Sequence, residues 1–277
     1  MSISVQTNVG SLMALDHLRT NTDFQSQTIQ RLTSGFRINQ SGDDASGLAI
    51  ANGYRTNVAE LNQGVRNAND GLSQLQITDG GLNNIAKMVD RLRTLATQGA
   101  SDTFTGDRLT LDAEFQAIKL EIDRQAQNIG LDAAGAGMAQ PLDVWVGGGT
   151  AGAAGTSIVK LDLTATSLVD STGLTINASA LTDKAASIAA LTSLSAATGQ
   201  LGTVQGQVGS SQNKLQYAVN LASSQSVNFS AAESRIRDAD IAAEASNLTK
   251  AQVLQQSSMA ALAQANSTPQ GVLSLLR

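Results

Sequence analysis

The chain has 277 residues, of which 42% are hydrophobic, 3% aromatic and 15% charged, and its formal net charge is −5. This acidic balance argues against nucleic-acid binding, because phosphate contacts need clustered Lys and Arg. The chain has no cysteine, so it can form neither a disulfide nor a thiolate metal site. Its apolar residues are mainly Ala, Leu, Ile and Val, which favour close helix packing over an aromatic-walled ligand pocket.

The N-terminal segment MSISVQTNVGSLMALDHLR has no Lys or Arg before Arg19 and no long apolar run. It therefore does not resemble a Sec-type signal peptide. No window approaches 18 consecutive apolar residues, so no membrane span is expected. If the protein acts outside the cell, a dedicated export machine must carry it there.

The C-terminal segment from Asp240 to Arg277 predicts a long amphipathic helix, with Glu244 and Lys250 as the only charges between Ile241 and Leu276. Residues at spacings of three, four or seven mark one face of this helix: Ile241, Ala245, Leu248, Gln255, Met259 and Leu262. A break is expected at Ser267-Thr268-Pro269. Because the polar face carries Ser, Asn and Gln instead of Lys and Glu, the helix is predicted to contact protein on several sides.

The N-terminal segment 1–39 predicts a similar weakly charged helix, interrupted near Gly35. Its stripe comprises Val5, Val9, Leu12, Leu15 and Leu18, continued by Ile29, Leu32 and Phe36. Two such helices at opposite ends of a chain are expected to pair with each other, since the entropy cost of loop closure grows slowly with length.

Heptad patterns dominate the rest of the helical sequence. One helix is expected over 58–97, kinked near Asp79 and ended by Gly99, and another follows a turn at 101–106 and ends at Gly130. Their apolar positions are Val58, Val65 and Leu72, then Leu61, Ala68, Leu75, Leu82 and Val89, then Leu111, Phe115, Ile118, Ile122 and Ile129. A further seam from Leu181 onwards contains Leu194, Leu201, Val208, Leu215, Ala222 and Phe229.

Between these helices, the segment 133–180 is rich in Gly and contains Trp145, the only tryptophan. Alternating runs at 158–163 and 173–176 predict short strands. The expected fold class is therefore mainly α: a coiled-coil or bundle rod of long helices formed by both terminal regions, with a small β-containing insertion in the middle.

Two groups of motifs resemble one family. Residues 31–50, RLTSGFRINQSGDDASGLAI, resemble the N-terminal signature of bacterial flagellins. Residues 233–241, 262–266 and 269–277, reading ESRIRDADI, LAQAN and PQGVLSLLR, are similar to the flagellin C-terminus. The resemblance covers roughly residues 1–130 and 180–277 and leaves the centre unmatched.

This resemblance implies a structural subunit of the extracellular flagellar filament, used for swimming motility. It implies an inner coiled-coil polymerisation domain from 1–42 and 234–277, a helical rod domain from 43–132 and 181–233, and an outward-facing insertion at 133–180. Implied partners are other copies of the chain, the flagellar type III export apparatus, an export chaperone that holds the C-terminal segment, and hook-associated junction and cap proteins. No cofactor is implied.

The predicted polymerisation residues fall into two groups. The apolar group, which supplies burial between subunits, consists of Leu12, Leu15, Leu32, Leu248, Met259, Leu262, Leu273 and Leu276. The charged group sets register: Arg31, Arg37, Asp43 and Asp44 are expected to pair with residues among Glu233, Arg235, Arg237, Asp238 and Asp240, across the connecting segments or between subunits.

The resemblance also implies a candidate contact with an animal Toll-like receptor, formed by Arg91, Leu95 and Glu114. The alternative is that Leu95 is a core or inter-subunit position and that the two charged residues are solvated.

Catalytic interpretations are weak. His17 is the only histidine, and no HExxH, Ser-His-Asp or Cys-His grouping exists. The run at 147–149 lacks the Lys-Ser/Thr of a phosphate loop, and Asp43-Asp44 is more typical of a cap or salt bridge than of a cation site. The alternatives to a filament subunit are a hook–filament junction protein and an adhesin or enzyme displayed by the insertion.

Overall fold

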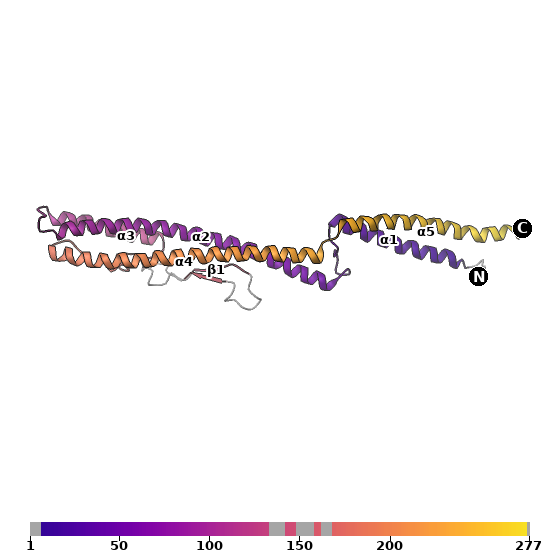
Figure 1. Cartoon of the computed structure of the whole chain (residues 1–277), viewed down its shortest axis with the longest axis horizontal. Coiled ribbons are helices and arrows are strands. Elements are labelled where there is room, and N and C mark those ends of the chain that lie inside the picture. The colour runs from indigo at the N-terminus through magenta and orange to yellow at the C-terminus, as the bar shows by residue number, and fades with distance from the viewer. Residues whose placement is uncertain (1–6, 133–141, 148–157, 162–167, 276–277) are drawn as a thin grey trace. The chain divides into compact units, whose positions relative to one another are not determined.

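The computed structural model describes residues 7–132, 142–147, 158–161 and 168–275. In these ranges the chain is mainly helical, with a single two-stranded sheet, and this confirms the predicted fold class. The elements in chain order, labelled where there is room in Figure 1, are α1 (Val9–Ser34), α2 (Ala45–Ala100), α3 (Arg108–Asn128), β1 (Leu142–Trp145), β2 (Ile158–Leu161), α4 (Lys184–Arg237) and α5 (Ile241–Leu275).

The chain divides into two compact units. The first, called the terminal unit below, consists of Met1–Thr56 and Asn228–Arg277, and the second, the central unit, consists of Asn57–Val227. Helices α2 and α4 contribute residues to both units. The three-part division expected from the sequence stays a prediction.

In the terminal unit, α1 and α5 lie side by side and run antiparallel, with the two ends of the chain at the same end of the pair (Figure 1). Asn8 caps the start of α1, because its side chain accepts a hydrogen bond from the Ser11 N–H. Gly35 ends α1 in the left-handed conformation, with φ 75°, and donates its N–H to the Arg31 carbonyl. The interruption expected near Gly35 is therefore confirmed.

Helix α2 begins at Ala45, well before the start expected at Val58. Asp44 explains the earlier start, since its carboxylate accepts the Gly47 N–H at 2.8 Å and so caps the first turn. As predicted, α2 runs through Asp79 and Gly81 as one long helix, and the kink expected near Asp79 stays a prediction. A Cβ at Gly81 would come within 2.4 Å of the Ile129 side chain, so this glycine permits close packing rather than ending the helix.

Val58, Val65 and Leu72, which were predicted as one heptad position of α2, are only half-buried. The other predicted heptad positions form the core of the central unit. On α2 these side chains are at most 1% exposed, and on α4 at most 3% exposed, and they are Leu61, Ala68, Leu75, Leu82, Val89, Leu194, Leu201, Val208, Leu215 and Ala222. On α3, Phe115 and Ile122 are fully buried. Phe229 instead belongs to the terminal unit, where its ring stacks on Tyr54 with a centroid separation of 5.6 Å.

Strands β1 and β2 pair antiparallel, with Val144 opposite Val159. The end of β1 lies directly against α2, because a Cβ added to Gly64 would be 1.7 Å from the Val146 carbonyl oxygen. The strand predicted at 173–176 is wrong. Those residues form turns, in which the Asp170 carboxylate accepts the Gly173 N–H and Thr175 has φ 58°.

Helix α5 continues to Leu275, so the break predicted at Ser267-Thr268-Pro269 is also wrong. Proline removes one donor from a helix, but the neighbouring groups can compensate. Here the carbonyl that loses its donor is that of Ala265, and the Asn8 side chain of α1 donates to it at 2.8 Å. Among the described residues, no helix is long and apolar enough to cross a membrane.

Candidate functional site

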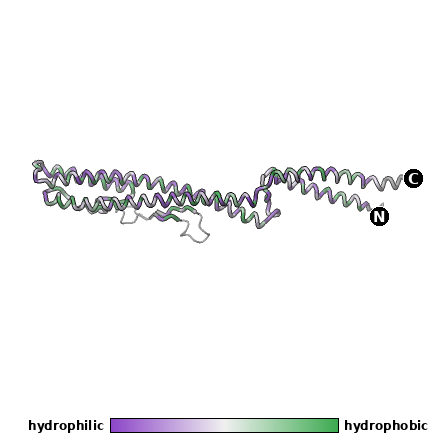
Figure 2. Tube along the Cα trace, viewed as in Figure 1, coloured by the Kyte–Doolittle hydropathy of each residue, from purple (hydrophilic) through white to green (hydrophobic). Residues whose placement is uncertain are grey.

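The pair formed by α1 and α5 leaves much of its apolar surface uncovered. Thr28 is the only buried residue of α1 among those described, although the apolar stripe runs along the helix. The exposed side chains include Val9, Leu12, Met13 and Leu15 on α1, at 54–60% exposure, and Ile241, Val253 and Met259 on α5, at 49–61% exposure. Figure 2 shows hydrophobic residues recurring along both helices. Exposed apolar surface of this extent is typical of a protein interaction site.

The predicted apolar interface residues occupy two environments in this pair. Leu12, Leu15 and Met259 are exposed, whereas Leu32, Leu248 and Leu262 are half-buried. Leu273 belongs to α5, and Leu276 lies outside the described residues. The pair therefore provides both an internal seam and an outward apolar face.

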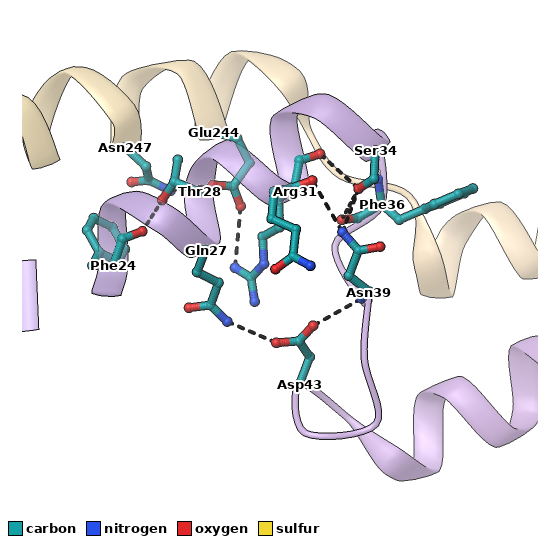
Figure 3. A network of polar contacts seen from close by, with 11 residues as sticks. Phe24, Gln27, Thr28, Arg31, Ser34, Phe36, Asn39, Asp43, Glu244 and Asn247 are labelled. Carbon is teal, nitrogen blue, oxygen red and sulfur yellow. Dashed lines mark hydrogen bonds and ion pairs between the residues drawn. The ribbon is translucent and has the colours of Figure 1, made fainter. Parts of the chain in front are cut away.

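A polar cluster joins the end of α1 to the start of α5 (Figure 3). The Arg31 guanidinium lies 3.4 Å from the Glu244 carboxylate, and the two side chains are 26% and 10% exposed. Asn247 donates to the second carboxylate oxygen of Glu244 at 3.5 Å. Glu244 was not among the predicted site residues, although it is the only acidic residue between Ile241 and Leu276. That isolation is the sequence signal that could have identified it.

The segment after α1 is held by Asp43 (Figure 3). Its carboxylate accepts the N–H groups of Asn39 and Gln40, at 3.0 and 3.2 Å, and the Gln27 amide at 2.9 Å. The hydrogen bond from the Asn39 backbone is the main cause that lowers the pKa of Asp43 from its usual 3.8, and the Gln40 and Gln27 bonds and the Arg31 charge act in the same direction. Asp43 thus works as an ionised anchor for this turn.

The two connecting segments of the terminal unit pair through their backbones. Phe36 and Asp238 form an isolated antiparallel bridge, and the Ala239 N–H donates to the Gly35 carbonyl at 2.9 Å. The Arg37 guanidinium donates a hydrogen bond to the Ile236 carbonyl at 2.8 Å. The Arg237 guanidinium lies 4.1 Å from the centre of the Phe36 ring, a cation–π contact.

The charged residues predicted to set register are brought together only in part. Among the ion pairs of the described residues, none joins Arg31, Arg37, Asp43 or Asp44 to Glu233, Arg235, Arg237, Asp238 or Asp240. Arg237 pairs with Glu233 inside α4 at 3.8 Å, Asp240 accepts the Ala242 N–H at the start of α5, and Arg235 is exposed. Pairing of these charges between subunits stays a prediction.

The candidate receptor contact lies in the central unit. Arg91 of α2 and Glu114 of α3 form an exposed ion pair, with the Arg91 Nε 2.9 Å from the carboxylate. Leu95 is 2% exposed and belongs to the core. The surface of the described chain therefore presents the two charged residues of this set and not the leucine.

Other candidates do not converge on a site. His17 is exposed on α1, and Asp43 and Asp44 are each engaged in separate backbone hydrogen bonds. In the part of the chain that the structure describes, no group of three or more His, Cys, Asp or Glu side chains is placed to hold a metal ion. Gly147 has φ 81°, and Gly148 and Gly149 lie outside the described residues.

Comparisons with known proteins agree with the terminal motifs. The model of the bacterial flagellin N-terminal helical region matches residues 5–133, and that of the bacterial flagellin C-terminal helical region matches residues 190–276. The flagellin of Halalkalibacterium halodurans is 33% identical, and that of Bacillus subtilis 32% identical, each over 99% of both chains. The crystal structure of Bacillus cereus flagellin is 28% identical, with a TM-score of 0.48 over 61% of this chain and 94% of that chain.

Proposed function

The chain belongs to the bacterial flagellin family, and on that basis we propose that α1 and α5 are the element through which its copies polymerise. Flagellins are the structural subunits of the bacterial flagellum, so this chain assembles with itself into the extracellular filament used for motility. A filament grows without closing, which requires a heterologous interface, in which different faces of successive subunits meet.

The observation that carries the proposal is the exposed apolar face of the terminal pair. Leu12, Leu15 and Met259 are each about half exposed or more. Fully burying a side chain of this size stabilises by about 1.5–3 kcal/mol. Several such residues on one pair supply enough free energy to join subunits, whereas in the single chain they remain in contact with water.

The same feature supports the proposed export partners. A two-helix pair with so little burial is marginal on its own, because helices gain most of their stability from packing. Segments of this kind order when a partner covers them. The terminal segments of the monomer are therefore available to an export chaperone and to the flagellar export apparatus, and in the finished organelle to hook-associated junction and cap proteins.

Recognition by an innate-immune receptor is a second proposal, and it rests on the exposed pair Arg91 and Glu114. A reporter-cell assay with purified monomer tests it. Loss of signal in Arg91→Ala is the expected result, and a wild-type protein that gives no signal rejects it. No observation favours a hook–filament junction protein or a displayed adhesin.

Seeded polymerisation tests the main proposal. Leu12→Gln and Met259→Gln each remove apolar area from the exposed face, and each is expected to raise the critical concentration about tenfold or more. Arg19→Gln, also exposed on α1, is the matched control and is expected to polymerise like the wild type. Unchanged critical concentrations for both apolar variants, measured by sedimentation and electron microscopy, would refute the role of this face.

A further inference from the structure

We infer that Asn8 fixes the register of α1 against α5, by donating a hydrogen bond to a carbonyl group that Pro269 leaves without its helical donor. The Asn8 Nδ2 lies 2.8 Å from the carbonyl oxygen of Ala265, and the two residues are 257 positions apart in sequence. The inference rests on the proposed pairing of α1 with α5 in the filament and names the residue that aligns the two helices.

Helix α5 contains one proline, Pro269, and runs through it to Leu275. In an α-helix the carbonyl of residue i accepts the N–H of residue i+4. Because proline has no N–H, the carbonyl of Ala265 lacks that donor. Backbone carbonyls that are partly buried need a partner, and the Asn8 amide provides one.

The other half of the Asn8 amide is also engaged. Its Oδ1 accepts the Ser11 N–H at 3.2 Å and so caps α1. One side chain therefore completes the first turn of α1 and, at the same time, the turn of α5 that Pro269 interrupts. Both bonds form together only when the start of α1 lies beside Ala265.

Near the connecting segments, the ion pair of Arg31 with Glu244 aligns the two helices. Towards the ends of the chain, the contacts other than that of Asn8 discriminate less strongly between registers. Asn21 donates to the Ser258 hydroxyl at 2.9 Å, but α5 also offers Ser257, Gln255 and Gln256 as polar alternatives nearby. In contrast, before its last turn α5 has a single carbonyl that lacks an i+4 donor. A single polar group that pairs with one such position sets register in helix pairs, as a lone Asn does in a coiled coil.

A double-mutant cycle tests whether Asn8 pairs with the Ala265 carbonyl because Pro269 leaves that carbonyl without a donor. Asn8→Asp keeps the capping oxygen and removes the donor, whereas Pro269→Ala restores the N–H that the Ala265 carbonyl lacks. Asn8→Asp is expected to raise the critical concentration for polymerisation about fivefold with Pro269 present, and to change it little in the Pro269→Ala background. Asn21→Asp is the matched control, with the same effect in both backgrounds.

Cysteine crosslinking reads the register directly, because the chain has no cysteine of its own. A Cβ added at Gly10 lies 4.0 Å from the Ala265 Cβ, within the range of a disulfide. Gly10→Cys with Ala265→Cys therefore reports the register of the structure, and Gly10→Cys with Ala261→Cys reports a slip of one helical turn. In filaments, the first pair is expected to crosslink with Asn8 present, and Asn8→Asp is expected to lower that yield and raise the second.

The outcomes separate the two proposals. The register inference alone is overturned if the 10–265 pair crosslinks equally in the Asn8 protein and in Asn8→Asp, and neither forms the 10–261 crosslink. Absence of the 10–265 crosslink in filaments of either background overturns the pairing of α1 with α5, and the register inference with it. Additive effects of Asn8→Asp and Pro269→Ala overturn the inferred link between these two residues.

Discussion

Arg31 on α1 and Glu244 on α5 form an ion pair at 3.4 Å, although 213 residues separate them in sequence. Both side chains are largely withdrawn from water, and the Nε of Arg31 is buried and has no hydrogen-bond partner within the described part of the chain. The pair therefore joins the two terminal helices at the end of the seam opposite Asn8 and Ala265.

Removal of the Glu244 carboxylate leaves Arg31 partly buried without its counter-charge. Because truncating one partner of such a pair leaves an uncompensated charge, Glu244→Gln is expected to destabilise filaments by about 1–3 kcal/mol. Thermal depolymerisation measures the effect. Lys250→Gln, which also removes one charge but at an exposed position of the same helix, serves as the control. Equal melting temperatures for the two variants would show that the ion pair contributes nothing.

The stability of the terminal unit is expected to depend on the ionisation of Asp43 at acidic pH. Its folded-state pKa lies below the usual 3.8, so its contribution to stability is fully present above that value and is lost as the pH falls through the lowered pKa. Asp43→Asn is expected to lower the stability of the terminal unit at neutral pH and to flatten its dependence on pH below 3.8. Acid depolymerisation curves measure this, with Asp23→Asn, an exposed position on α1, as the control. Parallel curves for Asp43→Asn and the wild type would contradict the prediction.

Two glycines of α2 are expected to respond to alanine in opposite directions. At Gly64 a Cβ would meet the Val146 carbonyl oxygen at 1.7 Å, so Gly64→Ala must displace the end of β1 and is expected to cost about 1–3 kcal/mol. At Gly80 no atom lies within 4 Å, so Gly80→Ala is expected to stabilise by about 1 kcal/mol through helix propensity. Thermal unfolding of the monomer, followed by circular dichroism, measures whether each substitution raises or lowers the stability. Stabilisation by both substitutions would mean that β1 does not press on α2.

Lys119 of α3 fixes the turns at the end of the insertion. Its ammonium group donates to the carbonyls of Asn177 and Ser179 at 2.6 and 3.2 Å, and burial lowers its pKa from 10.5. Lys119→Met keeps the volume and removes the donors, so it is expected to destabilise the central unit by about 1–3 kcal/mol. Denaturant unfolding of the monomer measures the loss. Lys87→Met, exposed on α2, is the control, and an equally small effect at both positions would refute the role of Lys119.

Local patterns determined which side chains are buried along the long helices. Leu61, Leu75, Leu194 and Leu215 were predicted from heptad spacing and are fully buried, because a helical period places such residues on one face whatever that face meets. The same reasoning located the end of α1, since glycine adopts the left-handed cap conformation that Gly35 shows. The family motifs at the two ends were likewise identified from the sequence alone.

Contacts between distant residues decided the rest. Proline at 269 predicts a break, yet α5 continues, and the Asn8 amide supplies the donor that its Ala265 carbonyl lacks. The run 173–176 alternates like a strand, but its backbone turns back on the residues before it, with the Leu174 N–H donating to the Asp170 carbonyl at 2.9 Å. Asp123 of α3 anchors this turn by accepting the Ser171 N–H at 2.6 Å. Glu244 is a lone charge in the sequence and becomes a partner only where α1 brings Arg31 beside it. A linear pattern gives the residue type and its face, whereas hydrogen bonds and ion pairs depend on which distant group the fold places within about 3 Å.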